Sequence, residues 1–381
     1  MTAPKEEPRI SALLAERIEA GDFPSAVYLV AEGGRARFAG AHGDAVREPE
    51  RRPATLETIY DLASLTKPLV TGLLAAILFE RGAFELDEAV AGRLPELDRD
   101  GMRGVTVRQL LTHTSGLPAW LPLYALAGGD RGRVLEVIAS QPDAYEPGSR
   151  VVYSDLGFIT LGLFLQEVAG APLDEMARRE IFAPLGLRRT FFNPEESFRT
   201  EVAACESGGN AYEREVCASE HGIERGGGWR TETIWGQVHD GNAFFLGGAA
   251  GHAGLFSTAR ETLLIASQFL ASTTGLLSEK TCALFRENMT EGLNEARSFA
   301  WQLAATPEST AGPLLPPEAF GHLGFTGTSC WLEPARGRVF ILLTNRTHAR
   351  TPPFVNINGT RRRFHTLAVE ALGRDEPGNE D

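Results

Sequence analysis

The sequence predicts an α+β fold in which an antiparallel sheet, built from both chain termini and flanked by helices, carries an inserted, mainly helical subdomain. Strand-like runs occur near both ends of the 381-residue chain, and helical patterns fill its middle. Hydrophobic residues make up 43% of the chain, enough for a sizeable core. We expect residues 1–84 and 291–381 to form the sheet unit and residues 85–290 the helical one.

The N-terminal pattern is a helix followed by a hairpin. Residues 10–20 place apolar side chains on one helix face. Two strand-like runs follow, 25–31 and 36–39, and the Gly33-Gly34 pair between them is typical of a hairpin turn. This part of the chain therefore supplies one edge of the expected sheet.

Three further elements are predicted with similar clarity. Residues 65–81 are apolar almost all round, which indicates a helix buried on every side. Near the C-terminus, residues 328–332 and 339–344 read as two strands joined by a short turn. A final helical pattern covers residues 361–372. The strands at this end complete the expected sheet.

The middle of the chain alternates helical patterns with Gly and Pro. Within it, residues 194–251 are rich in Gly and polar residues and show little periodicity, so we expect a long loop region there. Long segments without regular elements are more often functional than plain connectors. We therefore expect this loop to border a pocket and to act as a specificity element or lid.

Charge and composition limit the partners of the protein. The formal net charge of −13 argues against nucleic-acid binding, which needs a basic face. The sequence shows neither a signal-peptide pattern nor an apolar run of about 20 residues, so we expect a cytoplasmic protein without a membrane span. Four widely spaced cysteines predict reduced thiols rather than a disulfide framework or a zinc site, and we expect no cofactor. The oligomeric state stays open.

The first candidate for chemistry is Ser64-Leu65-Thr66-Lys67, where the buried helix begins. Residues three apart share a helix face, so Ser64 and Lys67 can approach each other. The helix N-terminus stabilises an oxyanion, and burial would lower the pKa of Lys67 so that it accepts the serine proton. Alternatively, Ser64 caps the helix and Lys67 is a surface charge. The apolar surroundings of Lys67 argue against a surface position.

Two further motifs follow along the chain. In Tyr153-Ser154-Asp155, a tyrosine beside a lysine ammonium would ionise more easily and shuttle protons, although a lone tyrosine is more often a core residue. In His322-Leu323-Gly324-Phe325, the glycine allows close backbone approach to a substrate. The Phe325 N–H could then pair with that of Ser64 as an oxyanion hole. Alternatively, this segment is only a tight turn.

Taken in order, these three motifs resemble the signature elements of the penicillin-recognising serine enzymes. Within that group they resemble the class C β-lactamase-like branch, which includes serine carboxylesterases and D-Ala-D-Ala peptidases. Residues 107–118 and 343–346 also resemble this branch, and residues 236–257 resemble a penicillin-binding-protein-4B-like subgroup. The resemblance runs from about residue 20 to residue 370 and implies the β-lactamase/transpeptidase-like fold.

The resemblance implies a role for each residue. Ser64 would be the nucleophile, and Lys67 with Tyr153 the general base and acid pair. Asp155 would stand where relatives carry a substrate-orienting Asn. His322, where many carry a lysine, would be a further catalytic residue that takes part in proton transfer. A carboxylate and a mostly neutral imidazole suit an anionic substrate poorly and a neutral ester better.

Two interpretations are possible for the remaining histidines. His239, Asp240 and His252 could be metal ligands, but the surrounding glycines and the lack of a third paired ligand favour a structural role, so we expect no metal. His113 lies in a Thr-His-Thr-Ser turn, where we expect it to be hydrogen-bonded structure. The chain has no Gly-x-Ser-x-Gly elbow of the α/β-hydrolases.

The sequence thus predicts a carboxylesterase-like or amidase-like serine hydrolase that forms an acyl-enzyme on Ser64 with a small ester or amide. In the same class, a β-lactamase or a D-Ala-D-Ala carboxypeptidase is the alternative. From another class, a non-catalytic binding protein could keep the same fold. The natural substrate stays open.

Overall fold

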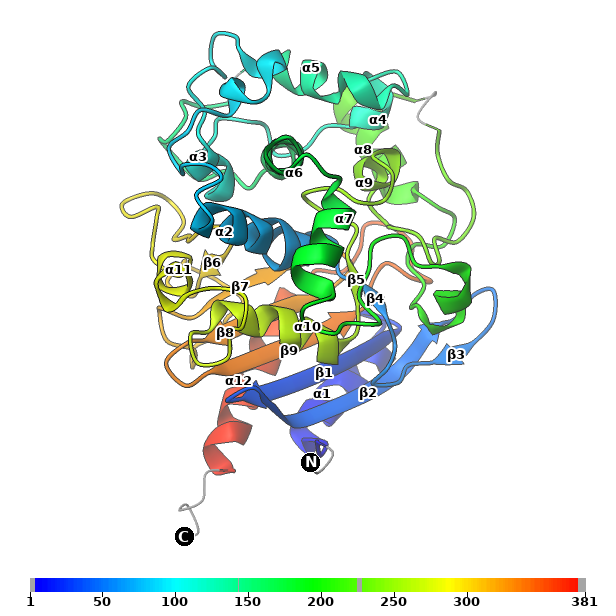
Figure 1. The fold of residues 1–381 in the computed structure, drawn as a ribbon. Helices are drawn as coiled ribbons and strands as arrows, with labels where there is room; N and C mark the ends of the chain where they lie inside the picture. Colours follow the sequence, from blue (N-terminus) through cyan, green and yellow to red (C-terminus); the bar gives the residue numbers. More distant parts are fainter. Residues whose placement is uncertain (1–3, 143, 225–227, 376–381) are drawn as a thin grey trace.

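A seven-stranded antiparallel sheet forms the base of the protein (Figure 1). The computed structural model describes residues 4–142, 144–224 and 228–375. The spatial order of the strands is β3-β2-β1-β9-β8-β7-β6. The strands are β1 (Ser25–Glu32), β2 (Arg35–Val46), β3 (Arg52–Pro53), β6 (Gln302–Leu303), β7 (Phe320–Leu323), β8 (Ser329–Glu333) and β9 (Arg338–Thr344). N-terminal β1 pairs with C-terminal β9, which confirms the expected sheet from both chain ends.

The central strands carry apolar side chains on both faces of the sheet, which explains why both faces are covered. Val27 and Leu29 of β1 belong to the core on one face, and Tyr28 and Val30 belong to the core on the other. Successive side chains of a strand point to opposite faces, so an all-apolar strand needs a layer on each side. This requirement accounts for helices above and below the sheet.

Two helices from opposite chain ends cover one face of the sheet (Figure 1). They are α1 (Pro8–Glu19) and α12 (Asn358–Arg374), which contact each other. Phe364, Leu367 and Ala371 of α12 pack with Ile10 and Leu14 of α1, at the three- and four-residue spacing of a helix face. The predicted terminal helices are therefore confirmed.

The remaining helices cover the other face and extend away from the sheet (Figure 1). They are α2 (Leu73–Glu80), α3 (Val107–Leu111), α4 (Leu123–Leu126), α5 (Val134–Ala139), α6 (Asp155–Ala169), α7 (Leu173–Ala177), α8 (Ala211–His221), α9 (Gly241–Phe245), α10 (Ala259–Ala266) and α11 (Glu279–Leu284). A short pair, β4 (Tyr60–Asp61) and β5 (Phe256–Ser257), joins distant segments beside this layer. The proposed division at residues 84 and 290 stays a prediction.

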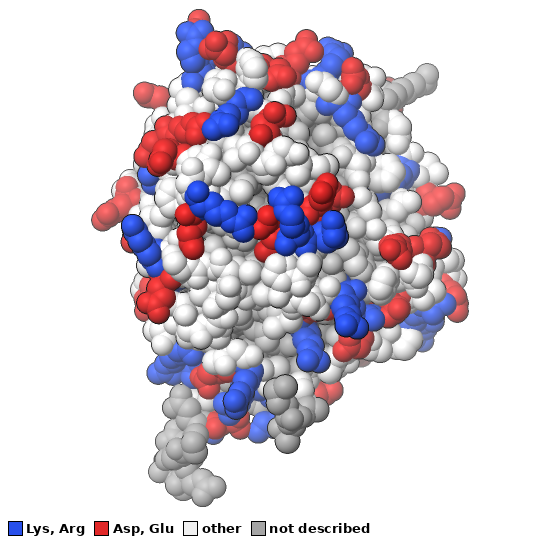
Figure 2. Space-filling view, in the orientation of Figure 1, with Lys and Arg blue, Asp and Glu red and all other residues white. Residues whose placement is uncertain are grey.

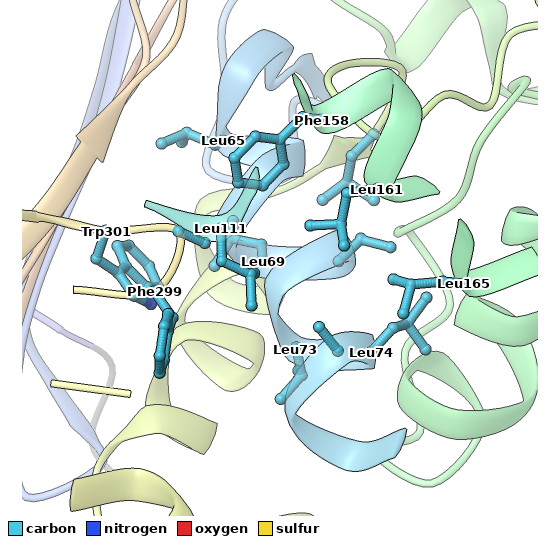
Figure 3. Packing of buried hydrophobic residues seen from close by; sticks show 14 of the residues in the cluster. Leu65, Leu69, Leu73, Leu74, Leu111, Phe158, Leu161, Leu165, Phe299 and Trp301 are labelled. Carbon is cyan, nitrogen blue, oxygen red and sulfur yellow. The ribbon is translucent and has the colours of Figure 1, made fainter. Parts of the chain in front are cut away.

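The buried helix predicted over 65–81 is present but not uniform. Ala63–Leu65 is a 3₁₀ turn, Lys67–Gly72 a π-helix, and only α2 is α-helical. Leu69, Leu73 and Leu74 pack against α6 and against Trp301 and its neighbours (Figure 3). A π-helical stretch changes which side chains share a face, and such stretches are frequent at functional sites.

This stretch also bears on membrane association. Within the described residues, Ala63–Glu80 is long and apolar enough to cross a bilayer, and 83% of it is buried inside the protein. A second span would require α6 and the Leu173–Phe182 helix, bent 73° apart, to act as one. Core helices pass the same test, and burial identifies Ala63–Glu80 as one of them. The cytoplasmic location stays a prediction.

The expectation of a long loop over residues 194–251 was wrong in part. The segment contains a 3₁₀ stretch, Glu196–Glu201, together with α8 and α9. Helix α8 has few apolar residues, so its sequence lacks a strong apolar stripe. It ends at Gly222, whose left-handed conformation suits a glycine. Residues 225–227 lie outside the described residues.

The surface carries both signs of charge. On the face shown in Figure 2, Lys and Arg side chains are interspersed with Asp and Glu and form no continuous basic patch. This view agrees with the net charge of −13. A phosphate backbone would therefore find no basic track on that face.

Close packing of the segment after α9 against α6 generates a stability prediction. A Cβ on Gly251 would lie 2.0 Å from the Phe158 carbonyl oxygen and 3.0 Å from Gly162. We expect Gly251→Ala to lower the free energy of unfolding by about 2 kcal/mol or more, because backbone must move. Urea denaturation measures this change. Gly373→Ala in α12, where nothing lies within 4 Å, is the matched control and should be neutral or stabilising by up to about 1 kcal/mol. Equal stability of the two variants would contradict the packing argument.

Candidate active site

Ser64 lies in a strained turn at the end of β4. The preceding residue, Ala63, has a φ of 48°, in the left-handed region that non-glycine residues rarely adopt. Asp61 holds the turn, because its Oδ1 accepts the Ala63 N–H at 2.8 Å and its Oδ2 accepts the His239 N–H at 2.7 Å. The strain therefore persists through contacts made by a segment far along the chain.

The loop between β7 and β8 also holds this turn. Thr326 Oγ1 donates to the Asp61 carbonyl at 2.8 Å, and Thr328 Oγ1 donates to the Leu62 carbonyl at 3.0 Å. A Cβ on Gly324 would lie 2.0 Å from Thr328 Oγ1 and 2.5 Å from the Leu62 carbonyl oxygen. We predicted that Gly324 admits a substrate. The structure shows that it admits the serine turn, although it also lines the cavity described below.

Lys67 is fully buried, and its ammonium makes hydrogen bonds to several parts of the chain. Nζ donates to Ser64 Oγ at 3.1 Å, to Asp155 Oδ1 at 2.6 Å and to the His252 carbonyl at 3.2 Å. The surface alternative for Lys67 was therefore wrong. Asp155 is the first residue of α6, and its side chain forms an ion pair with Lys67.

The pKa of Lys67 differs from our expectation. Burial disfavours the ammonium, but the charge of Asp155, together with hydrogen bonds to Asp155 and Tyr153, outweighs burial and raises the pKa of Lys67 above its ordinary value. The predicted lowering was wrong because the sequence does not reveal the ion pair. Lys67 therefore rests in the charged form.

Tyr153 lies beside Lys67 and Ser64. Lys67 Nζ lies 4.8 Å from the centre of the Tyr153 ring, and the ring packs on His113 at 4.6 Å. Burial raises the pKa of Tyr153, and the Lys67 charge offsets only part of this effect. The expectation that Tyr153 ionises easily was therefore wrong, and its hydroxyl is neutral at rest. His113 Nδ1 accepts the Ser154 N–H at 3.0 Å, in agreement with a structural role.

His322 is a buried, neutral residue on β7. Its Nδ1 is 2.8 Å from the Leu323 carbonyl oxygen, while Nε2 has no hydrogen-bond partner among the described residues. Burial, with the nearby charges of Arg297 and Lys67, lowers the pKa of His322 well below its usual value. Its ring lies 5.7 Å from that of Tyr153. His322 therefore brings an uncharged ring to the position next to Tyr153.

A cation that the sequence analysis missed lies beside the Tyr153 ring. Arg297 Cζ is 5.5 Å from the centre of the Tyr153 ring, and Arg297 Nη2 donates to Glu295 Oε1 at 2.8 Å. The Arg297 side chain is buried. No motif marks this arginine, because it comes from an irregular segment before β6. The positive charge absent from His322 is thus present nearby on Arg297.

The backbone donors expected for an oxyanion are free. In the part of the chain that the structure describes, the Ser64 and Phe325 N–H groups have no backbone or side-chain acceptor. The Phe325 carbonyl accepts from Arg346 Nε at 2.7 Å, which fixes the orientation of this segment. Their use as an oxyanion hole stays a prediction.

His239 and His252 each pair with a carboxylate. His239 Nε2 is 2.8 Å from Glu206, and His252 Nε2 is 2.8 Å from Asp240 Oδ1. Burial works against His239 carrying charge, but Glu206 outweighs it and raises the pKa of His239. These contacts agree with a structural role for both histidines.

The structure places Asp155 beside two of the possible metal ligands, Asp240 and His252. Ligand atoms of Asp155, Asp240 and His252 all lie within 4.8 Å of one another, a grouping that the sequence spacing did not reveal. The Lys67 ammonium is bound to Asp155, and it would repel a divalent cation placed there. These residues therefore fit a metal poorly.

All predicted catalytic and substrate-binding residues except the fully buried Lys67 line a cavity of about 680 Å³. The helical side of the cavity contributes acidic groups, among them Asp155, Asp240 and Glu213. The lining also contains the arginines Arg297, Arg346 and Arg361. Burial and the charge of Asp240 raise the pKa of Glu213 to about 7. The lining residues include Ser64, Trp120, Tyr153, Asp155, Tyr212, Val216, Glu220, Phe325, Arg346 and Phe354.

Comparison with known proteins identifies the family. The family model described as Beta-lactamase matches residues 10–358. The chain belongs to the β-lactamase family. Putative D-alanyl-D-alanine carboxypeptidases are similar to it: that of Escherichia coli K12 is 33% identical over 315 residues, covering 78% of this chain and 71% of the relative. That of Salmonella paratyphi B is 32% identical over 325 residues, covering 80% and 73%.

Solved structures share the β-lactamase-family fold. EstCE1, a hydrolase with promiscuous acyltransferase activity, superposes with a TM-score of 0.72 at 24% identity, covering 96% of this chain and 97% of EstCE1. A class C β-lactamase from Rhodobacter sphaeroides gives 0.71 at 22%, covering 96% and 100%. With the family match and the relatives at 32–33% identity, the protein is a serine hydrolase of the β-lactamase family, as the sequence motifs predicted.

The neutral state of His322 generates a test. Because its pKa lies well below 6.5, we expect His322→Gln to keep kcat/KM within about ten-fold and to leave the pH profile between about pH 5 and 8 unchanged. Ester hydrolysis followed in a pH-stat measures both quantities. An acidic limb that disappears in the variant would show that His322 titrates during turnover and would contradict this assignment.

Proposed function

We propose that the protein forms an acyl-enzyme on Ser64 and hydrolyses small carboxylic esters or amides, in the manner of a carboxylesterase. The observation that carries this proposal is the 3.1 Å contact between Lys67 Nζ and Ser64 Oγ beside the cavity. A serine activated by a neighbouring proton-transfer group is the arrangement that nucleophilic catalysis needs. The two free N–H groups of Ser64 and Phe325 support charge stabilisation on the substrate oxygen.

The proton path in this proposal uses Lys67, Tyr153 and Asp155 together. Ser64 Oγ attacks the carbonyl carbon, and its proton passes to this group. The group returns the proton to the leaving alcohol or amine, and a water then hydrolyses the acyl-enzyme and regenerates Ser64. Because Lys67 is charged at rest, Asp155, 2.6 Å from Nζ, is the acceptor that lets Lys67 receive the serine proton. Asp155 thus acts as the partner of Lys67 rather than as a substrate-orienting group.

Two observations support an ester as the substrate. His322 is neutral where many relatives carry a lysine, and Leu323 beside it offers no hydroxyl to a substrate carboxylate. EstCE1, which has the same fold, is described as a hydrolase with acyltransferase activity. A neutral ester requires no permanent cation at that position.

A D-Ala-D-Ala carboxypeptidase activity is the second candidate. Relatives at 33% identity carry that name, and the ion pair with Lys67 compensates the Asp155 charge that would repel a substrate carboxylate. Arg297 also adds a positive charge near Tyr153. A substrate carboxylate would therefore meet less repulsion in this site than the residues Asp155 and His322 alone suggest.

Serine and lysine variants test the mechanism. We expect Ser64→Ala and Lys67→Ala each to lower kcat by about a thousand-fold or more, because the nucleophile and its proton partner act as one unit. Hydrolysis of a p-nitrophenyl ester measures turnover, and circular dichroism checks that the fold is retained. Full activity in either folded variant would contradict the proposal. A fluorophosphonate probe should label wild type and not Ser64→Ala.

A substrate panel separates the two candidate activities. Wild-type protein is assayed in parallel with a short-chain p-nitrophenyl ester, a chromogenic cephalosporin and a diacetylated L-Lys-D-Ala-D-Ala peptide. We expect ester hydrolysis to exceed the other two rates. Release of D-alanine at the highest rate would instead assign the carboxypeptidase activity, and dominant cephalosporin turnover would assign a β-lactamase.

Asp155→Asn tests the proton path. Removal of the carboxylate leaves burial as the main influence on Lys67, so its pKa falls, and the rising limb of kcat/KM should move to lower pH by about one unit or more. Asp155→Glu, which keeps the charge, is the matched control and should keep the limb in place. If Asp155 only orients the substrate, Asp155→Asn will raise KM and leave the limb unchanged.

A further inference from the structure

Three aromatic side chains from distant segments meet at one end of the cavity. They are Tyr212 of α8, Phe325 of the β7–β8 loop and Phe354, which precedes α12. The ring centres are 5.1 Å apart for Tyr212 and Phe325, 6.0 Å for Phe325 and Phe354, and 5.7 Å for Tyr212 and Phe354. These separations are those of rings in mutual contact.

All three rings are half-buried rather than part of the core, and all three line the cavity that contains Ser64. Aromatic side chains that keep an accessible surface inside a concave site are typical binding surfaces for the apolar part of a ligand. We propose that Tyr212, Phe325 and Phe354 form a subsite for an aryl group of the ester or amide. This inference rests on the proposed function and specifies its substrate class.

Helix α8 extends the same wall. Tyr212, Val216 and Glu220 are four residues apart, share one face of the helix, and all line the cavity. Trp120 lines the cavity as well. The apolar wall thus continues beyond the three rings, while Glu220 gives its end a polar rim. This pattern fits a ring held between apolar surfaces with a polar group directed outward.

Phe325 is fixed before any ligand arrives. Its ring stacks on that of His239 at 5.5 Å, and Arg346 Cζ lies 4.9 Å from its centre. Arg346 is itself held by its bonds to the Phe325 and Val355 carbonyls. A ring that is already ordered loses little conformational entropy when it binds a partner. The part of the wall that Phe325 forms is therefore preformed.

The positive charge of Arg346 beside the rings indicates which kind of ligand group they can bind. Arg346 next to Phe325 disfavours a ligand cation at the rings, even though aromatic clusters otherwise bind cations well. A neutral aryl group meets no such repulsion and stacks on the rings. Because the acyl and the alcohol side of an ester could each carry it, the experiment separates these two sources.

Three esters test the subsite. Benzyl acetate carries its ring on the alcohol, its isomer methyl phenylacetate carries it on the acyl group, and methyl acetate has no ring. We expect Tyr212→Ala and Phe354→Ala to lower kcat/KM about ten-fold for one of the two aryl esters relative to methyl acetate. The affected ester identifies the side of the substrate that the subsite binds. Phe198→Ala, which removes a half-buried aromatic ring outside the cavity lining, is the matched control and should leave both ratios unchanged.

A binding measurement separates the subsite from turnover. Benzylboronic and methylboronic acid both react with an active serine, and their dissociation constants follow from tryptophan fluorescence. We expect Phe354→Ala to reduce the preference for the benzyl compound about ten-fold. Unchanged ester ratios and unchanged boronate preference in both variants would overturn the subsite while leaving the Ser64 mechanism intact. Failure of wild type to hydrolyse any of the three esters or to bind either boronate would overturn the proposed function and this inference with it.

Discussion

The ion pair between the buried Lys67 and the half-buried Asp155 is the constraint on which the rest of the site depends. An unpaired ammonium in this position would be costly, because burial strongly disfavours an isolated charge. The pair ties the π-helix to the start of α6 at 2.6 Å, and the same ammonium binds Ser64 and the His252 carbonyl. One cation thus joins the serine turn, the helical layer and the segment after α9.

The contact between Lys67 and the His252 carbonyl requires the segment that carries His252 to pack closely on its neighbours. Gly251 and Gly162 let the segment that carries His252 approach α6, and Thr71 Oγ1 donates to the Gly251 carbonyl at 2.7 Å. Around Tyr153, the neutral rings of His113 and His322 and the buried Arg297 complete an environment in which charge is present but mostly compensated. The Ser64 hydroxyl consequently lies next to groups that exchange protons only when a neighbour also changes its charge.

The sequence predicted the elements whose pattern is local. The strand-like runs of β1 and β9, the terminal helices and the order of the three motifs all follow from residues close together in the chain. The sequence did not reveal features that depend on distant partners: the raised pKa of Lys67, the position of Arg297 over Tyr153, and the Glu206–His239 pair. Helix α8 was missed because its stabilising contacts lie in the cavity wall rather than in an apolar stripe.

The pairing of β1 with β9 has a consequence for biosynthesis. Val27 lies opposite Leu343, so the centre of the sheet joins segments separated by almost the whole chain. While the ribosome is translating, β1 and its hairpin partner β2 remain without the strand that completes them, and their apolar faces stay uncovered. The loop that pins the Ser64 turn also emerges late, since Thr326 and Thr328 follow most of the sequence. The nascent chain therefore acquires its chemistry only in the last steps of synthesis, and until then depends on collapse or on a chaperone to shield its N-terminal strands.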